Sequence, residues 1–148
     1  MIKKILIAPT FVALSLLCII IFYFFLPAYN FIPFPFNLSG LIIVYLGFVV
    51  MGKSRELFKK NAVSLDITEP AILIREGVFL KSRNPMYAGM FLLLLGTAIC
   101  FRNIFSILSA FAFVIMVQIF VIPREEKLML KAFGDEYLAY KRKIRRWL

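Results

Sequence analysis

Two short stretches of this sequence carry polar and charged side chains next to long apolar runs. The first, RNPMY at residues 83–87, directly precedes an apolar run, and the second, EE at residues 125–126, directly follows another. Asparagine favours the N-cap of a helix, and proline is well tolerated at the first helical position. The first stretch therefore predicts a helix that begins at Pro85, and this structural role alone explains both Asn84 and Pro85.

The same helix start offers an anion-binding site. The first backbone N–H groups of a helix lack partners within it, and the positive end of the helix dipole favours negative charge. Arg83, which stands beside this start, can bind a carboxylate through two parallel hydrogen bonds. Two interpretations thus stay open, a purely structural helix start and a site for a carboxylate group.

The two glutamates have no basic residue where their own helix would supply one. Ion pairs on a helix form at spacings of three or four residues, and these positions around Glu125 and Glu126 are all apolar. Because carboxylates at a membrane boundary need a partner, we expect a cation from elsewhere in the fold, such as Arg83, or a cationic ligand. Solvation among lipid headgroups is the alternative. Gln118, seven residues before Glu125, would continue a polar track into the apolar run.

Together these residues predict one cleft for a zwitterion with an adjacent cation. The helix start and Arg83 would hold a carboxylate, and the glutamates would hold a cation. Tyr87, one turn into the helix, would supply a hydroxyl group or a ring. S-adenosylmethionine is a molecule of this kind.

The composition indicates that a membrane surrounds these stretches. The chain has 148 residues, of which 62% are hydrophobic, and a formal net charge of +10, whereas soluble domains carry about 45–50% apolar residues. We therefore expect one integral membrane domain, residues 1–148, with no nucleic-acid partner. Histidine is absent, so acid–base chemistry falls to carboxylates, tyrosines or the substrate. Cys18 and Cys100 are too few for a disulfide framework or a thiolate metal site, and no metal is expected.

Four apolar segments must position the two stretches, and we expect an all-α protein with four transmembrane helices. The segments are residues 5–26, 36–51, 86–101 and 104–122. Since a crossing takes about 20 residues, the second and third segments are short. Only Arg102 and Asn103 separate the last two, which predicts a tight antiparallel hairpin. The first resembles a signal peptide, but it is long and lacks a small-x-small cleavage site, so we expect it to be retained.

The basic residues predict the orientation of these spans. Of the 18 lysines and arginines, a four-span topology places all but Arg102 on one face. Basic residues favour the cytoplasmic side, so we expect both termini in the cytoplasm, and the cell inner membrane if the source is bacterial. A topology with three or five spans would scatter these charges over both faces.

Two segments on this face have patterns of their own. Residues 52–85 form the predicted cofactor loop, which first extends the second helix and then continues as an ordered, extended segment around Pro70 and Gly77. Residues 124–147 predict an amphipathic helix, which Gly134 interrupts. Such a helix lies at the membrane interface, with lysines on acidic lipid, and a lid over a site would have the same pattern. Its apolar stripe consists of Leu130, Phe133, Tyr137, Tyr140, Ile144 and Trp147.

The stretch GVFLKSRNPMYAG, followed by a hairpin and then by EEKLMLKAFGDEYLAYKRKIRRW, resembles the isoprenylcysteine carboxyl methyltransferase and phospholipid methyltransferase families. Those families show Arg-His-Pro-x-Tyr, then Glu-Glu-x-x-Leu, Phe-Gly-x-x-Tyr and a Tyr-Lys-Arg tail. The likeness runs from about Leu65 to Trp147. It implies an integral membrane enzyme that transfers a methyl group from S-adenosylmethionine to a lipophilic acceptor in the bilayer.

The resemblance also implies cofactor-binding residues, to which we add Arg83 from the argument above. By position they are Ile72, Leu73, Ile74, Phe79, Asn84, Pro85, Met86, Tyr87 and Glu125. Asn84 stands where those families have histidine; it can donate a hydrogen bond but cannot act as a base. Val121 stands near the place of an arginine that contacts substrate in the isoprenylcysteine enzymes, which argues against a prenylated cysteine as the acceptor.

The acceptor stays open between a phospholipid amine and a lipid-linked carboxylate. An amine must first lose a proton, for which Glu126 and Tyr87 are the predicted catalytic residues, whereas a carboxylate needs no base. The alternatives are an NADPH-dependent membrane reductase of the sterol reductase type, for which 148 residues leave little room, and a non-enzymatic scaffold. RELFKKN only echoes the motif of the four-span glutathione transferases. Membrane lipids and a lipophilic substrate are the expected partners, and the oligomeric state stays open.

Overall fold

The computed structural model describes residues 7–61 and 72–147. Across these two ranges the chain is helical and forms no strand, apart from an isolated bridge between Asn30 and Asn103. The all-α prediction is therefore confirmed for this part of the chain. Lys3, Lys4 and the part of the predicted extended segment around Pro70 lie outside the described residues. At Gly77 this prediction is wrong, because Gly77–Leu80 forms a short 3-10 helix.

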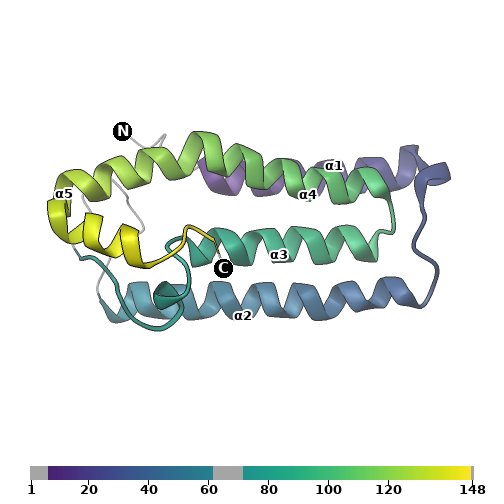
Figure 1. Cartoon of the computed structure of the whole chain (residues 1–148). Coiled ribbons are helices and arrows are strands. Elements are labelled where there is room, and N and C mark those ends of the chain that lie inside the picture. Colours follow the sequence, from purple (N-terminus) through teal and green to yellow (C-terminus); the bar gives the residue numbers. More distant parts are fainter. Residues whose placement is uncertain (1–6, 62–71, 148) are drawn as a thin grey trace.

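Helices that run alternately in opposite directions form the body of the protein (Figure 1). They are α1 (Ile7–Phe25), α2 (Ser39–Lys60), α3 (Pro85–Cys100) and α4 (Ile104–Met116). Helix α2 lies along α3, α3 also packs against α4, and α1 lies along α4. The short helices η1 (Pro27–Tyr29) and η2 (Phe36–Leu38) connect α1 to α2, and η3 (Gly77–Leu80) precedes α3 at the opposite end.

The helix that starts at Ile104 continues beyond α4. A π-helical segment, η4 (Val117–Val121), joins it to α5 (Ile122–Lys143). Within α5, Gly134 has φ 51° and ψ −126°, a conformation open to glycine because it lacks a Cβ atom. The helical path breaks at this residue, and the last part of α5 turns back towards the start of α3 (Figure 1).

The predicted amphipathic helix at residues 124–147 is wrong at its end. Helix α5 ends at Lys143, and Ile144 has extended angles, φ −112° and ψ 135°. The apolar stripe also divides at the break, because Leu130 is exposed whereas Tyr137 and Tyr140 are buried. The hydroxyl group of Tyr140 donates to the carbonyl oxygen of Phe79 at 2.7 Å. The second half of the stripe therefore packs against the protein, as a lid would.

Among the described residues, three helical runs are long and apolar enough to cross a membrane. They are Ala8–Phe25, Phe36–Lys60 and Ile104–Lys143, and the apolar part of the last one precedes Arg124. The second run includes the predicted extension of the second helix beyond Met51, because α2 continues to Lys60. Helix α3 has 16 residues and is the shorter apolar helix. These runs are typical of an integral membrane protein, and a full crossing by α3 stays a prediction.

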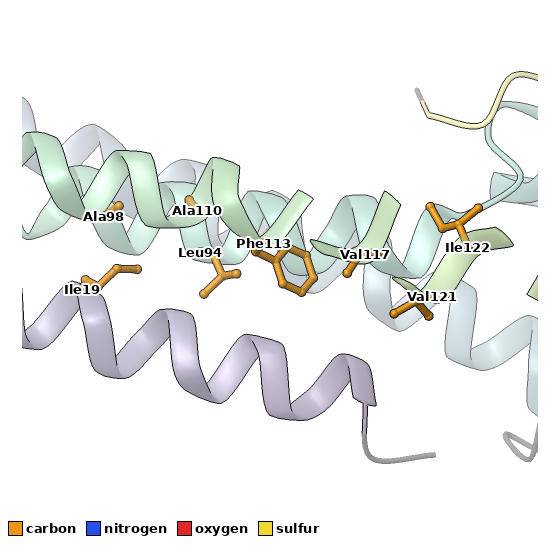
Figure 2. Packing of buried hydrophobic residues seen from close by; sticks show 8 residues of the cluster. All are labelled: Ile19, Leu94, Ala98, Ala110, Phe113, Val117, Val121 and Ile122. Atoms are coloured by element: carbon orange, nitrogen blue, oxygen red, sulfur yellow. The ribbon is translucent and has the colours of Figure 1, made fainter. Parts of the chain in front are cut away.

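The core is a row of apolar side chains that joins α1, α3, α4 and η4 and reaches the start of α5 (Figure 2). Its eight buried members are Ile19, Leu94, Ala98, Ala110, Phe113, Val117, Val121 and Ile122. Many large apolar side chains outside this row, such as Phe24 on α1 and Phe48 on α2, are exposed, as a lipid-facing surface requires. The row ends at Ile122, three positions before Glu125. The packed core therefore positions the part of the helix that carries Glu125 and Glu126.

Helices α2 and α3 approach each other closely because glycines face one another. A Cβ atom added at Gly40 would lie 2.3 Å from the carbonyl oxygen of Gly96. One added at Gly47 would lie 2.8 Å from that of Gly89. Small residues let membrane helices bring their backbones into contact. This contact holds α3 firmly and thereby positions the residues at its start.

The turn between α3 and α4 is closed by an uncharged side chain, that of Asn103. Asn103 is completely buried, and its Oδ1 atom accepts the backbone N–H of Phe105 at 2.9 Å, which caps α4. Its amide nitrogen reaches three acceptors at the end of α1: the carbonyl oxygens of Phe22 and Leu26 and Oδ1 of Asn30. Arg102 has φ 69° and donates to the carbonyl oxygen of Ile32. The predicted tight hairpin is present.

Candidate functional site

The start of α3 and the first turns of α5 meet at the end of the bundle opposite Asn103. The hydroxyl group of Tyr87 donates to Oε1 of Glu125. Nη1 of Arg83 lies 3.1 Å from Oε1 of Glu126. The glutamates, which lack cations at the neighbouring positions of their own helix, thus obtain partners from the stretch at residues 83–87. Both stretches singled out in the sequence belong to one site.

Helix α3 begins at Pro85, with Asn84 at the N-cap position, but Asn84 does not cap it. The side chain of Asn84 accepts no hydrogen bond from the helix start. Its Nδ2 atom instead donates to the carbonyl oxygen of Arg146 at 3.2 Å. The positive end of α3 is therefore left without a side-chain acceptor from its own cap, and it favours an anion.

Glu126 is surrounded by cations. Nη1 of Arg83 lies 3.1 Å from it, Nζ of Lys141 lies 2.9 Å from it, and Arg146 donates from Nε and Nη2 at 3.1 and 3.0 Å. Burial acts to raise the pKa of Glu126, but the bonds from Arg146 and Lys141 and the charge of Arg83 hold it below its ordinary value. These contacts favour an ionised, fixed carboxylate over the proton acceptor that the sequence suggested.

Arg83 is the buried cation of the site. Its side chain is 9% exposed. Within the described residues, Nε and Nη1 are buried and make no hydrogen bond, although Nη1 is close enough to Glu126 for an ion pair. A buried donor without an acceptor costs about 1–3 kcal/mol, and more when it is charged. Arg83 therefore has donors to offer to a carboxylate ligand.

Glu125 lies in a different environment from Glu126. It is half-buried, beyond the apolar part of its helix, and the hydroxyl group of Tyr87 is its hydrogen-bond partner. Burial raises the pKa of Glu125 to about 7, although the bond from Tyr87 acts to lower it. Near neutral pH this carboxyl group is thus able to gain and lose a proton, and when ionised it can face a cation.

The last described residues, Ile144–Trp147, follow α5 without helix or strand structure, and we call this segment the C-terminal strap. The backbone N–H of Arg83 donates to the carbonyl oxygen of Arg145 at 2.9 Å, and Oγ of Ser82 donates to that of Arg146 at 3.0 Å. The indole Nε1 of Trp147 donates to Oε1 of Gln118 at 2.9 Å. The partner of Gln118 is thus the strap, and a polar track from Glu125 through Gln118 stays a prediction. Residue types do not predict these contacts, because two of them end on backbone carbonyl groups.

The other predicted cofactor residues lie on the same end of the protein. Leu73 and Ile74 line an open hollow of about 410 Å³, together with Lys60, Asn61, Arg75 and Glu76. Ile72 is exposed, whereas Phe79 is buried below Tyr140. Met86 is half-buried in the first turn of α3. Polar contacts join Arg83, Asn84, Tyr87, Glu125 and Glu126 to one another or to the strap. Within the described part of the chain, the polar side-chain contacts of this group do not extend to Ile72, Leu73 or Ile74.

Comparison with known proteins identifies the family to which this arrangement belongs. The family described as phospholipid methyltransferase matches residues 36–136, which include α2, α3, α4 and the first half of α5. Over 63 residues the chain is also 40% identical to an uncharacterized protein of Haemophilus influenzae, a match that covers 43% of this chain and all of that protein. Since the family match includes both RNPMY and EE and more than half of the sequence, the chain belongs to the phospholipid methyltransferase family.

Proposed function

We propose that this membrane methyltransferase transfers a methyl group from S-adenosylmethionine to a lipophilic acceptor that reaches the site from the bilayer. Family membership supports methyl transfer. The observation that supports the proposed methyl donor is Arg83, which is buried beside the uncapped start of α3. Among the described residues its Nε atom has no hydrogen-bond partner, and its Nη1 atom makes only the ion pair with Glu126. An anionic group of a ligand would satisfy both features.

The residues present fit this donor. Arg83 and the first N–H groups of α3 would bind its carboxylate, and ionised Glu125 would stabilise its positive charge, because opposite charges attract strongly in a partly desolvated site. Bound there, the donor would supply a methyl group that its sulfonium centre already activates. The protein is then left with two tasks, to align the acceptor and to exclude water.

The buried tyrosines and the Tyr87–Glu125 pair are suited to these tasks. Tyr137 and Tyr140 on the returning part of α5 are buried, and they would help to exclude water from the site. If the acceptor is an ammonium group, one proton must leave its nitrogen before the nitrogen lone pair can attack. We assign the acceptance of that proton to a carboxylate oxygen of Glu125, in place of Glu126, whose oxygens already face three cations. A carboxylate acceptor would not need this step.

We place the site on the cytoplasmic side of the membrane, and of the inner membrane if the source is bacterial. In the ranges that the structure describes, Arg102 is the only basic residue at the end of the bundle opposite the site. Basic residues favour the cytoplasmic side, where a water-soluble donor is also available. In this arrangement α3 completes a fourth crossing and its start faces the cytoplasm.

Calorimetric titration of the purified protein in detergent with S-adenosylmethionine, and separately with NADPH, tests the donor. We expect binding of the first ligand and none of the second. The protein is then incubated with membrane lipids and a donor with an isotopically labelled methyl group, and the lipids are searched by mass spectrometry for that label. Binding of NADPH alone, or lipids that never acquire the label, would overturn the proposal.

Glu125→Gln provides the variant for this test, and Glu136→Gln provides the matched control. Glu136 lies on the same helix and also has a side-chain partner, Arg75, but its side chain is 59% exposed. We expect Glu125→Gln to weaken donor binding at least tenfold and Glu136→Gln to leave it unchanged. Equal effects of the two substitutions would show that general negative charge, and not the Tyr87–Glu125 pair, matters for binding.

A further inference from the structure

We propose that the C-terminal strap, Ile144–Trp147, is a working part of the site, in which Glu126 and Arg146 act as positioning residues for Arg83. The identity of the ligand in this inference rests on the proposed function. The contacts that support this inference are made between residues of the protein and involve no ligand. They join three segments that are far apart in the sequence.

The strap is bonded to the start of α3 at three successive residues. The backbone N–H of Arg83 donates to the strap, and so do the side chains of Ser82 and Asn84 on either side of it. Ser82 is completely buried, and its Oγ atom also accepts the backbone N–H of Asn84 at 3.1 Å. The backbone of Arg83 is therefore fixed by the strap, and not only by the helix that follows it.

Glu126 fixes the other end of the same arginine. Arg146 of the strap occupies both oxygens of this carboxylate, and Nη1 of Arg83 faces Oε1. Without the negative charge between them, the two guanidinium groups would repel each other. Glu126 thus allows the strap to close over Arg83, and it holds the guanidinium group in place through this shared contact.

The strap ends in a second anchor on the π-helical segment. Trp147 donates to Gln118 of η4, and its ring packs against the same apolar core as the ring of Tyr87. π-Helical turns occur frequently at functional sites. The strap therefore connects the start of α3, the carboxylate of Glu126 and η4, and it sets the position of Arg83 relative to Tyr87.

Loosening the strap should affect ligand binding more than the transfer step. Arg83 would keep its charge but lose its fixed position, so the KM for the donor should rise about tenfold while kcat stays within about twofold. Arg146→Ala tests this, and Arg146→Lys should restore part of the loss. Arg142→Ala is the matched control, because Arg142 is an exposed arginine near the strap whose side chain has no partner in the described part of the chain.

Tryptophan fluorescence gives a measurement that does not require activity. Trp147 is the only tryptophan of the sequence, so the emission of the whole protein reports the strap. We expect Arg146→Ala and Glu126→Gln to shift this emission to longer wavelength as the indole becomes more exposed to water, and Arg142→Ala to leave it unchanged. Circular dichroism in detergent checks that each variant keeps its helices.

Two outcomes would overturn the inference. In one, Arg146→Ala and Glu126→Gln shift the fluorescence but leave the KM for the donor at the wild-type value, so the strap is only structural. In the other, neither the fluorescence nor the KM differs from that of Arg142→Ala. Failure of the proposed function would look different, because the wild-type protein itself would then bind no S-adenosylmethionine.

Discussion

The two ends of this helical bundle are closed by different chemistry. At one end the buried amide of Asn103 caps α4 and bonds to the end of α1, and all of its partners are uncharged. At the other end Arg83 and Arg146 each form an ion pair with Glu126, and all three side chains are largely shielded from solvent. Buried ion pairs are weak evidence for stability, because their desolvation offsets much of their attraction. The neutral end thus stabilises the fold, whereas the charged end is the one that we propose binds a ligand.

Arg83→Met should have the largest effect on ligand binding. Methionine has a similar length but no donors, so the ligand carboxylate loses its charge-assisted hydrogen bonds, which contribute about 1.5–3 kcal/mol. We expect affinity for S-adenosylmethionine, measured by calorimetry, to fall about 100-fold, since each tenfold corresponds to about 1.4 kcal/mol. Stability should fall less, because Glu126 keeps Arg146 and Lys141. If Arg83→Met unfolded readily but bound S-adenosylmethionine with normal affinity, the charged end would contribute to stability and not to binding, and the proposed difference between the two ends would be wrong.

Asn103→Leu should produce the opposite pattern. It removes the cap of α4 and leaves carbonyl oxygens at the end of α1 without their hydrogen-bond donor, which costs about 1–3 kcal/mol. The free energy of unfolding in detergent should fall by this amount, while the dissociation constant for the donor ligand stays the same. Asn30→Ala is the control, because it removes one of these contacts and should cost less. Weakened ligand binding in Asn103→Leu would show that the two ends are coupled.

The sequence predicted the elements of both ends better than the contacts between them. Apolar runs located the helices, and Asn84-Pro85 and Arg102-Asn103 located two of their boundaries, because these residue types have strong local preferences. The missing cations around the glutamates correctly pointed to partners elsewhere in the fold, and Arg83 is one of them for Glu126. Local patterns therefore sufficed wherever a residue's role depends on its neighbours in sequence.

The C-terminal strap was beyond this reasoning. The spacing of the apolar stripe continues through Ile144 and Trp147, although the helix ends at Lys143. The contacts that hold the strap are made largely by its backbone carbonyl groups, which every residue has, so residue types carry no trace of them. Asn84 illustrates the same limit. The local preference of asparagine predicts that it caps α3, but its side chain instead donates to the backbone carbonyl group of Arg146.

The affinity for the donor should depend on pH through Glu125. Because burial raises its pKa to about 7, Glu125 is largely neutral below that pH and loses its attraction for a cation. We expect affinity for S-adenosylmethionine to increase up to about tenfold between about pH 6 and pH 8, the change that about one pKa unit of coupling produces. Glu125→Gln should remove this part of the profile, and any pH dependence that remains then belongs to the amino group of the ligand. An identical profile in wild type and variant would exclude Glu125 as the titrating group.

Lys141→Ala should have the smallest effect, although Lys141 lies as close to Glu126 as the two arginines do. Its side chain is 42% exposed, and exposed ion pairs contribute about 0–1 kcal/mol because water and salt screen them. We expect donor affinity to change less than about twofold, and the free energy of unfolding by less than about 1 kcal/mol. Measured beside Arg146→Ala, this variant separates charge from position. If Lys141→Ala and Arg146→Ala lowered donor affinity equally, the number of cations around Glu126 would determine binding. A larger loss in Arg146→Ala would show that binding depends on the position of the arginine in the strap.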